Sequence, residues 1–135
     1  MNARGFAMTE VLVALVVLGM ALTGGLGLAL EGFATTLEAR RAQQAAALAA
    51  DLAGRVAALP GIDWTSLPGA APCAPGCSPE QLAALELGRW REQLAATLPR
   101  ATGTLESTAA GVLLLRLEWT ETGGMPRRLE MGMLP

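Results

Sequence analysis

Hydrophobic residues are spread unevenly along this chain, and the longest uninterrupted run lies near the N-terminus. Twenty residues from Val11 to Leu30 carry no charge, and two acids, Glu10 and Glu31, stand at its ends. At about 1.5 Å per residue, a helix of this length spans the roughly 30 Å hydrocarbon core of a bilayer. The run therefore predicts a membrane-spanning helix.

A cleaved signal peptide and a buried helix both fit this run less well than a membrane span does. The apolar region of a cleaved secretory signal peptide is shorter, about 7–15 residues, and ends in a small-x-small cleavage site that does not close this run. A buried helix of a soluble protein needs a larger core than a globular domain this small can build around it. Arg4 is the one basic residue near this end, so we expect the N-terminus in the cytoplasm and the rest of the chain outside it.

Helical periodicity continues beyond the run and ends at Pro60-Gly61. An Ala-rich stretch supports it, because Ala has the highest helix propensity. One helix over 6–59 would be roughly 80 Å long, with 6–30 in the membrane and 31–59 beyond it. The apolar positions of the second part are Phe33, Leu37, Ala45, Leu48, Leu52, Val56 and Leu59.

The expected weak point of this helix is the glycine group at 24, 25 and 27. Each Gly costs about 1 kcal/mol of helix propensity relative to Ala. Glycines are common in membrane helices, so the group need not have a special role. The sharper hypothesis is a segment that unwinds when the chain leaves the bilayer.

A second helix is expected to start at Ser78-Pro79-Glu80-Gln81, which combines an N-cap Ser, a Pro at the first helical position and a Gln that completes a capping box. It should run to about Leu98, before Pro99. Its expected inner positions are Leu82, Leu85, Trp90, Leu94 and Leu98, with Leu87 beside them.

After this helix the hydrophobic period changes to two, which predicts strands. The segments are Thr102–Ser107, Leu113–Thr120 and Arg127–Met133, which we expect to form a three-stranded antiparallel sheet. The buried face should carry Leu113, Leu115, Leu117 and Trp119, and the third strand adds Leu129, Met131 and Met133. The expected fold is therefore α+β: a long N-terminal helix and a small head over 60–135.

Composition narrows the functional classes. Hydrophobic residues make up 52% of the chain and charged residues 16%, with a net charge of −2 and no His; all ten basic residues are Arg. Without His or Lys, Ser-His-Asp and Cys-His catalysis, Schiff-base chemistry and a P-loop are excluded. A near-neutral chain also lacks the basic surface that nucleic acids require. We expect no enzyme activity and no cofactor.

Cys73 and Cys77 are the two cysteines, in the spacing C-x-x-x-C. A zinc site needs four ligands, and without His the chain does not supply them; a redox CxxC motif has one residue fewer. Since we expect both thiols outside the cytoplasm, in an oxidising compartment, a disulfide between them is predicted.

Glu10 is the one acid at the start of the uncharged run, in the string RGFAMTEVL. An acid near a helix N-terminus is favoured by the macrodipole, by a few tenths of a kcal/mol up to about 1. A carboxylate within the bilayer boundary is nevertheless expensive, and it suggests a functional partner.

The string RGF-x-x-x-E followed by VLVALVVLG closely resembles the class III signal peptide of type IV pilins and pseudopilins. The resemblance implies a leader over 1–5, cleavage after Gly5 by a membrane prepilin peptidase, and N-methylation of the new terminal Phe6. It also implies that Glu10 takes part in subunit assembly. A staggered neighbour could bring its Phe6 amine to Glu10, so that neither charge is left alone in an apolar bundle.

The head extends the resemblance. The order CxxxC-S-P-x-Q-L-A-A, then Arg89-Trp90-Arg91, then a strand bearing Arg116-Leu-Glu-Trp119, looks like minor pilins of the PilV type. The resemblance implies a low-abundance structural subunit that primes a type IV pilus and lies near its tip. Implied partners are major and minor pilins, the platform protein, the assembly ATPase and a tip adhesin, in support of adhesion, twitching motility or DNA uptake.

Two alternatives stay open, and a third, an unrelated single-pass enzyme or sensor, is disfavoured because the chain has no His, Lys or Tyr. A minor pseudopilin of a type II secretion system shares the signal and the helix but usually lacks the CxxxC-SPxQL block. A tip binding module would touch DNA or a surface itself, through clustered exposed Arg. Against this module, Arg89, Arg91, Arg127 and Arg128 are offset by Glu86, Glu92, Glu121 and Glu130.

Overall fold

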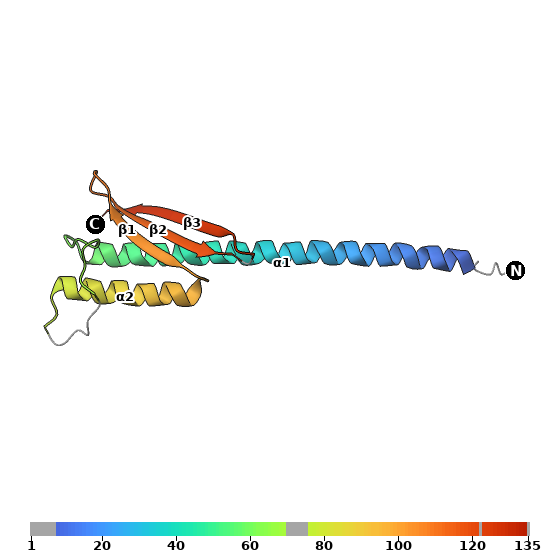
Figure 1. Cartoon of the computed structure of the whole chain (residues 1–135), viewed down its shortest axis with the longest axis horizontal. Coiled ribbons are helices and arrows are strands. Elements are labelled where there is room, and N and C mark those ends of the chain that lie inside the picture. Colours follow the sequence, from blue (N-terminus) through green and yellow to red (C-terminus); the bar gives the residue numbers. More distant parts are fainter. Residues whose placement is uncertain (1–7, 70–75, 122, 135) are drawn as a thin grey trace. The chain divides into compact units, whose positions relative to one another are not determined.

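The chain forms two helices followed by three strands, in the order α1, α2, β1, β2 and β3 (Figure 1). The computed structural model describes residues 8–69, 76–121 and 123–134. The chain divides into two compact units, with the boundary between Ala39 and Arg40. The predicted α+β arrangement of a long N-terminal helix, a second helix and a three-stranded antiparallel sheet is confirmed.

Helix α1 runs without a break from Met8 to Ala58. It begins with an acid in its first turn, Glu10, and has a basic residue in its last turn, Arg55, as the helix dipole favours. Pro60 follows the helix, and Gly61 has a φ of 79°, a left-handed conformation that suits Gly because it has no Cβ. The last part of α1, from Arg40, belongs to the second unit, which we call the head.

Helix α2, Pro79–Thr97, begins with the predicted capping box. The Ser78 hydroxyl accepts a hydrogen bond from the backbone N–H of Gln81 at 3.2 Å, and the Gln81 side chain accepts one from the Ser78 N–H at 2.9 Å. Two of the backbone donors that a helix start leaves unpaired are thereby satisfied. The helix ends at Leu98, whose N–H donates to the Leu94 carbonyl at 3.0 Å before Pro99.

Two predicted inner positions of α2 are wrong, because Leu82 is exposed and Leu85 is half-buried outside the core. Leu82 is 39% exposed, whereas the neighbouring Ala83 and Ala84 are buried. The buried side of α2 is turned toward its alanines because small side chains allow a close approach to neighbouring elements. The buried positions of the helix are Ala83, Ala84, Leu87, Trp90 and Leu94.

The sheet has the order β1-β2-β3, with both pairs antiparallel. The strands are β1 Thr102–Ser107, β2 Leu113–Thr120 and β3 Pro126–Met133. In β2 every second residue is buried, so the predicted alternation is confirmed. The other face is charged: Arg116 donates to Glu130 at 2.9 Å, and Arg128 donates to Glu118 at 2.9 Å.

One hydrophobic core joins the C-terminal part of α1, helix α2 and the inner face of the sheet. Trp90 is 1% exposed, and its indole N–H donates to the Leu48 carbonyl of α1 at 2.8 Å. Its ring also faces Gly103 of β1, where an added Cβ would lie 2.7 Å from the ring atom Cη2. Only a residue without a Cβ fits there, so Gly103 allows β1 to lie against α2.

Candidate functional site

Of the predicted site residues, Glu10 lies within the described part of the chain. It is exposed in the first turn of α1. Gly5, Phe6 and Cys73 lie outside the described residues, so the cleavage site, the methylation site and the Cys73–Cys77 disulfide stay predictions. Cys77 directly precedes the Ser78 N-cap of α2.

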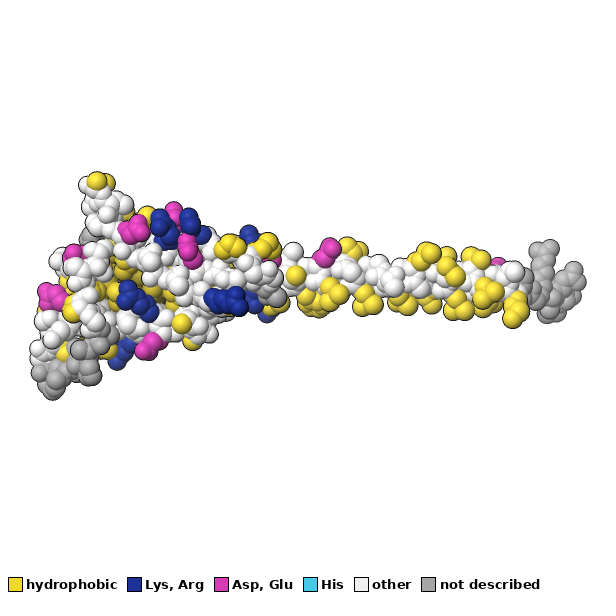
Figure 2. Space-filling model, in the orientation of Figure 1, with side chains coloured by type: hydrophobic (Ala, Val, Ile, Leu, Met, Phe, Trp, Pro, Cys, Tyr) yellow, Lys and Arg dark blue, Asp and Glu magenta, His cyan; other side chains and the backbone are white. Residues whose placement is uncertain are grey.

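The twenty residues that follow Glu10 are apolar on every side of the helix. The run VLVALVVL places large side chains at consecutive positions, which point to all faces of a helix. Figure 2 shows hydrophobic side chains along this part of α1 with few charged ones among them. A helix that is hydrophobic all round needs an apolar environment on every side.

None of this surface is buried within the protein. The most hydrophobic window has a mean hydropathy of 2.4 and is 0% buried. Individual side chains are widely open, from 48% for Val11 to 73% for Leu28. Burying one such side chain is worth about 1.5–3 kcal/mol, so the segment favours transfer out of water. Helix α1 is long and apolar enough to span a membrane.

The predicted weak point at glycines 24, 25 and 27 is helical in the structure. A Cβ added at any of these glycines would meet no atom within 4 Å, so packing within the protein does not require them. Thr23 donates its hydroxyl hydrogen to backbone carbonyls of the preceding turn, Gly19 at 3.1 Å and Met20 at 3.0 Å. Hydrogen bonds of this kind satisfy a hydroxyl in an apolar medium and tend to bend helices slightly.

The head contains a buried acid that the sequence pattern alone did not single out. Glu121 is 4% exposed. It accepts one hydrogen bond from the Arg41 guanidinium at 2.6 Å and another from the Trp119 indole at 2.7 Å. Burial opposes ionisation, but these two donors outweigh it, and the pKa of Glu121 lies below its usual value.

A signal for this acid was present in the sequence. The inward positions of β2 are 113, 115, 117 and 119, and one further step of two reaches Glu121. From the sequence, Glu121 was instead interpreted as one of the acids that offset nearby arginines such as Arg127 and Arg128. Arg41 is 80 residues away along the chain, so sequence proximity could not indicate the pair.

A second set of charged side chains links α1 to α2. Arg55 donates to Asp51 one turn earlier, at 2.9 Å from Nη2, and it also pairs with Glu86 of α2. Glu86 accepts in addition from Arg89 at 3.3 Å. These side chains are partly exposed and balanced in charge, so they stabilise the helix pair without forming a cationic surface.

Beyond these ion pairs, the described part of the chain shows few groups of side chains that could bind a ligand or a metal. Within residues 8–69, 76–121 and 123–134, no three His, Cys, Asp or Glu side chains form a group that could hold a metal ion. The arrangement offers instead a long unburied apolar helix with one acid at its start. No known protein family, no curated protein and no solved structure matches the chain significantly.

Proposed function

We propose that this chain is the precursor of a minor pilin, a structural subunit that helps prime a type IV pilus and lies at or near its tip. The observation that carries the proposal is Glu10, at the start of twenty uncharged residues that the protein itself leaves unburied. We expect this exposed apolar surface to lie in the lipid bilayer before assembly and to pack against the helices of other subunits after assembly. The motif RGFAMTE, with its Gly, aromatic residue and acid in register, supports the same function.

In this proposal, prepilin peptidase cuts between Gly5 and Phe6, and the freed amine of Phe6 is methylated. Each assembled subunit then carries one amine cation and one Glu10 carboxylate inside an apolar bundle. Either charge alone would be costly there, whereas a staggered neighbour brings the two together. The pair would set the axial register between subunits.

The head fits this structural task through its hydrophobic core and its balanced surface charges. Its core closes on itself across α1, α2 and the sheet, and two arginines of the sheet, Arg116 and Arg128, are paired with Glu130 and Glu118. The subunit would reach the filament from the cytoplasmic membrane, with the platform protein and the assembly ATPase driving insertion. Contact with other minor pilins and a tip adhesin is part of the same proposal.

The deciding experiment is Glu10→Gln, with Glu31→Gln as the matched control at the other end of the same uncharged run. Glu10→Gln should leave cleavage and membrane levels normal, yet strand the Phe6 amine of a neighbour. The expected cost is about 3–5 kcal/mol per contact, which corresponds to a loss of association of roughly 10²–10⁴-fold. Glu31→Gln should enter filaments normally.

The measurement compares processed protein in membranes with protein in sheared pili for the three chains. Mass spectrometry of the mature wild-type protein should find a methylated Phe6 at the N-terminus. Retention of Met1, or equal recovery of Glu10→Gln and wild type in pili, would contradict the proposal. Recovery in a secretion pseudopilus rather than a surface pilus would favour the type II secretion alternative.

A further inference from the structure

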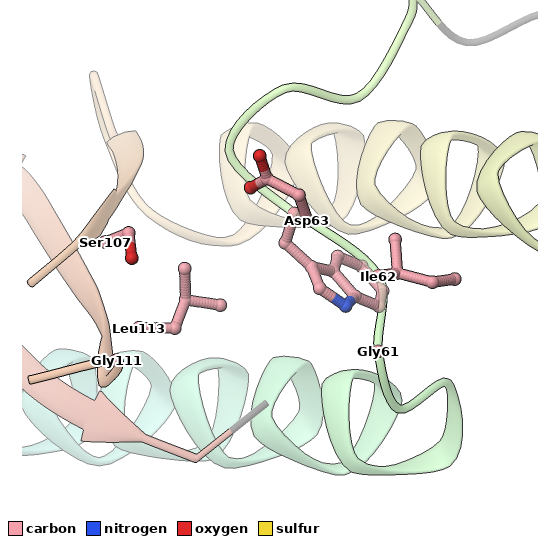
Figure 3. Close-up of a pocket in the computed structure, with 7 residues that line it drawn as sticks. Gly61, Ile62, Asp63, Ser107, Gly111 and Leu113 are labelled. Carbon is pink, nitrogen blue, oxygen red and sulfur yellow. The ribbon is translucent and has the colours of Figure 1, made fainter.

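A cavity of about 290 Å³ opens in the head between two loops (Figure 3). One wall is the segment 61–64, which connects α1 to α2. The opposite wall belongs to the β1–β2 hairpin and includes Ser107, Gly111 and Leu113. Figure 3 shows Leu113 and Ser107 facing Ile62 and Asp63 across this space.

The tryptophan that lines this cavity differs from the other two. Trp90 donates its indole N–H to the Leu48 carbonyl at 2.8 Å, and Trp119 donates to Glu121 at 2.7 Å. Trp64 is 2% exposed, and its Nε1 meets no acceptor among the described residues. A buried indole normally finds a partner, because an unpaired buried donor is costly. The indole N–H of Trp64 therefore requires an acceptor from another molecule.

The walls of the cavity indicate the kind of molecule. Ile62, Leu113 and the Trp64 ring make it apolar, which suits an aliphatic side chain. Gly61 and Gly111, with φ of 79° and 75°, have open space where a Cβ would lie, so another backbone can approach closely. The volume corresponds to about ten water molecules at ~30 Å³ each, which is room for a residue rather than a large ligand.

Asp63 limits the charge of that molecule. Its carboxylate accepts from the Thr65 hydroxyl at 2.5 Å, the Thr65 N–H at 2.9 Å and the Ser66 hydroxyl at 2.8 Å. These bonds, led by the Thr65 hydroxyl, lower the pKa of Asp63, so it is ionised at neutral pH. An anionic ligand would be repelled at the mouth of the cavity.

We propose that this cavity binds an extended peptide segment of another polypeptide that carries no negative charge. One aliphatic side chain of the segment enters between Ile62 and Leu113, and its backbone carbonyl accepts from the Trp64 indole N–H after a small rotation of the ring. The site does not depend on the pilin function proposed above. It gives the head a contact surface of its own, far along the sequence from Glu10.

The test uses the full ¹⁵N-labelled chain in detergent micelles and N-acetyl-leucinamide as the probe. The three indole N–H resonances report separately on Trp64, Trp90 and Trp119. The probe should move the Trp64 resonance saturably and leave the other two in place. Movement of all three resonances, or of none at millimolar probe, would overturn the proposal.

Variants sharpen the result. Ser107→Phe fills the cavity and should abolish the response, while Thr104→Phe, on the same strand but outside the cavity, should preserve it. Unchanged Trp90 and Trp119 resonances verify that each variant is folded. Trp64→Phe keeps a ring and removes the donor, and should weaken binding about three- to tenfold, followed through the Leu113 methyl resonances.

A charged probe tests the ligand class. N-acetyl-aspartate amide should bind far more weakly than N-acetyl-leucinamide, because Asp63 lies at the cavity. Equal responses to both probes would show that the site does not select against negative charge and would overturn the proposal. Filament assembly by the Ser107→Phe chain, measured separately, shows whether the site and the Glu10 function are independent.

Discussion

The two units of this protein bury similar apolar residues to opposite extents. The first unit, up to Ala39, and the head are both rich in Leu and Ala. In the first, large apolar side chains are consecutive and exposed; in the head they are periodic, and Leu52, Leu115 and Leu117 are 0% exposed. A periodic pattern can bury itself against other elements, whereas a continuous one needs an apolar environment from outside.

The largest difference between the units should appear when a large side chain is truncated in each. Trp90→Ala removes a buried ring and its hydrogen bond to Leu48, and should lower the free energy of unfolding of the head by about 3–5 kcal/mol. Leu15→Ala, in the exposed apolar run, should change it by less than about 0.5 kcal/mol. Denaturant unfolding of the full chain in detergent, followed by near-UV circular dichroism, measures both. Similar losses from the two variants would contradict the contrast between the units.

A methyl group added to a glycine should also act differently in the two units. In Gly103→Ala the new Cβ would lie 2.7 Å from Cη2 of Trp90, and the overpacking should cost about 1–3 kcal/mol. In Gly24→Ala nothing lies within 4 Å, and the higher helix propensity of Ala should stabilise α1 by up to about 1 kcal/mol. The same unfolding measurement tests Gly103→Ala, and far-UV circular dichroism on heating tests Gly24→Ala. A tolerated Gly103→Ala would mean that β1 does not lie against the Trp90 ring.

The predicted Cys73–Cys77 disulfide should stabilise the head and leave the apolar helix unaffected. Closing so short a loop is worth about 2 kcal/mol by the chain-entropy estimate. Alkylation of cell-envelope extracts should label neither thiol before reduction and both afterwards. Reduction should lower the stability of the head and leave the far-UV signal of α1 unchanged. Labelling of both thiols without reductant would show that the disulfide does not form.

The smallest expected effect concerns Glu121, the buried acid of the head. Glu121→Gln should cost about 1–2 kcal/mol at neutral pH, since Arg41 loses its carboxylate partner but is 25% exposed. The exposed Glu130→Gln, which loses a pair with Arg116, should cost less than about 0.5 kcal/mol.

The direction in which the stability of the head changes with pH follows from the pKa of Glu121. Because the folded pKa of Glu121 lies below the usual 4.5, the unfolded chain binds the proton more readily. The stabilisation by Glu121 is therefore complete above about pH 4.5 and is lost as the pH falls through the folded pKa. Glu121→Gln should flatten the acid limb of stability against pH, and Glu130→Gln should not. An unchanged acid limb in Glu121→Gln would show that the Arg41 pair does not contribute.

Local patterns predicted the elements of the head well. The capping box at Ser78 and the period of two in β2 are complete within short windows, so they needed no knowledge of the fold. The inner face of α2 was less accurate, because its burial depends on where other elements lie. Leu82 was expected inside by its place in the hydrophobic pattern, yet the buried side of the helix carries Ala83 and Ala84.

The sequence predicted Glu10 as a candidate functional residue but did not predict the cavity at Trp64. Glu10 stands out because a single acid interrupts an otherwise apolar segment, and that contrast is visible in one dimension. The cavity at Trp64 was not predicted, since its walls come from two loops more than forty residues apart. No local pattern indicates that Trp64, unlike Trp90 and Trp119, lacks an acceptor among the described residues.

The sequence by itself determined which segments are helix and strand, and that α1 begins with an uncharged run long enough to cross a bilayer, because propensity, capping and periodicity act over a few neighbouring residues. Only the tertiary structure decided which partners those elements meet. The pairing of Arg41 with Glu121, the fit of Gly103 against Trp90 and the cavity beside Trp64 all join residues distant in the chain. Such contacts depend on packing distances of a few ångströms, to which the pattern of residue types alone is insensitive.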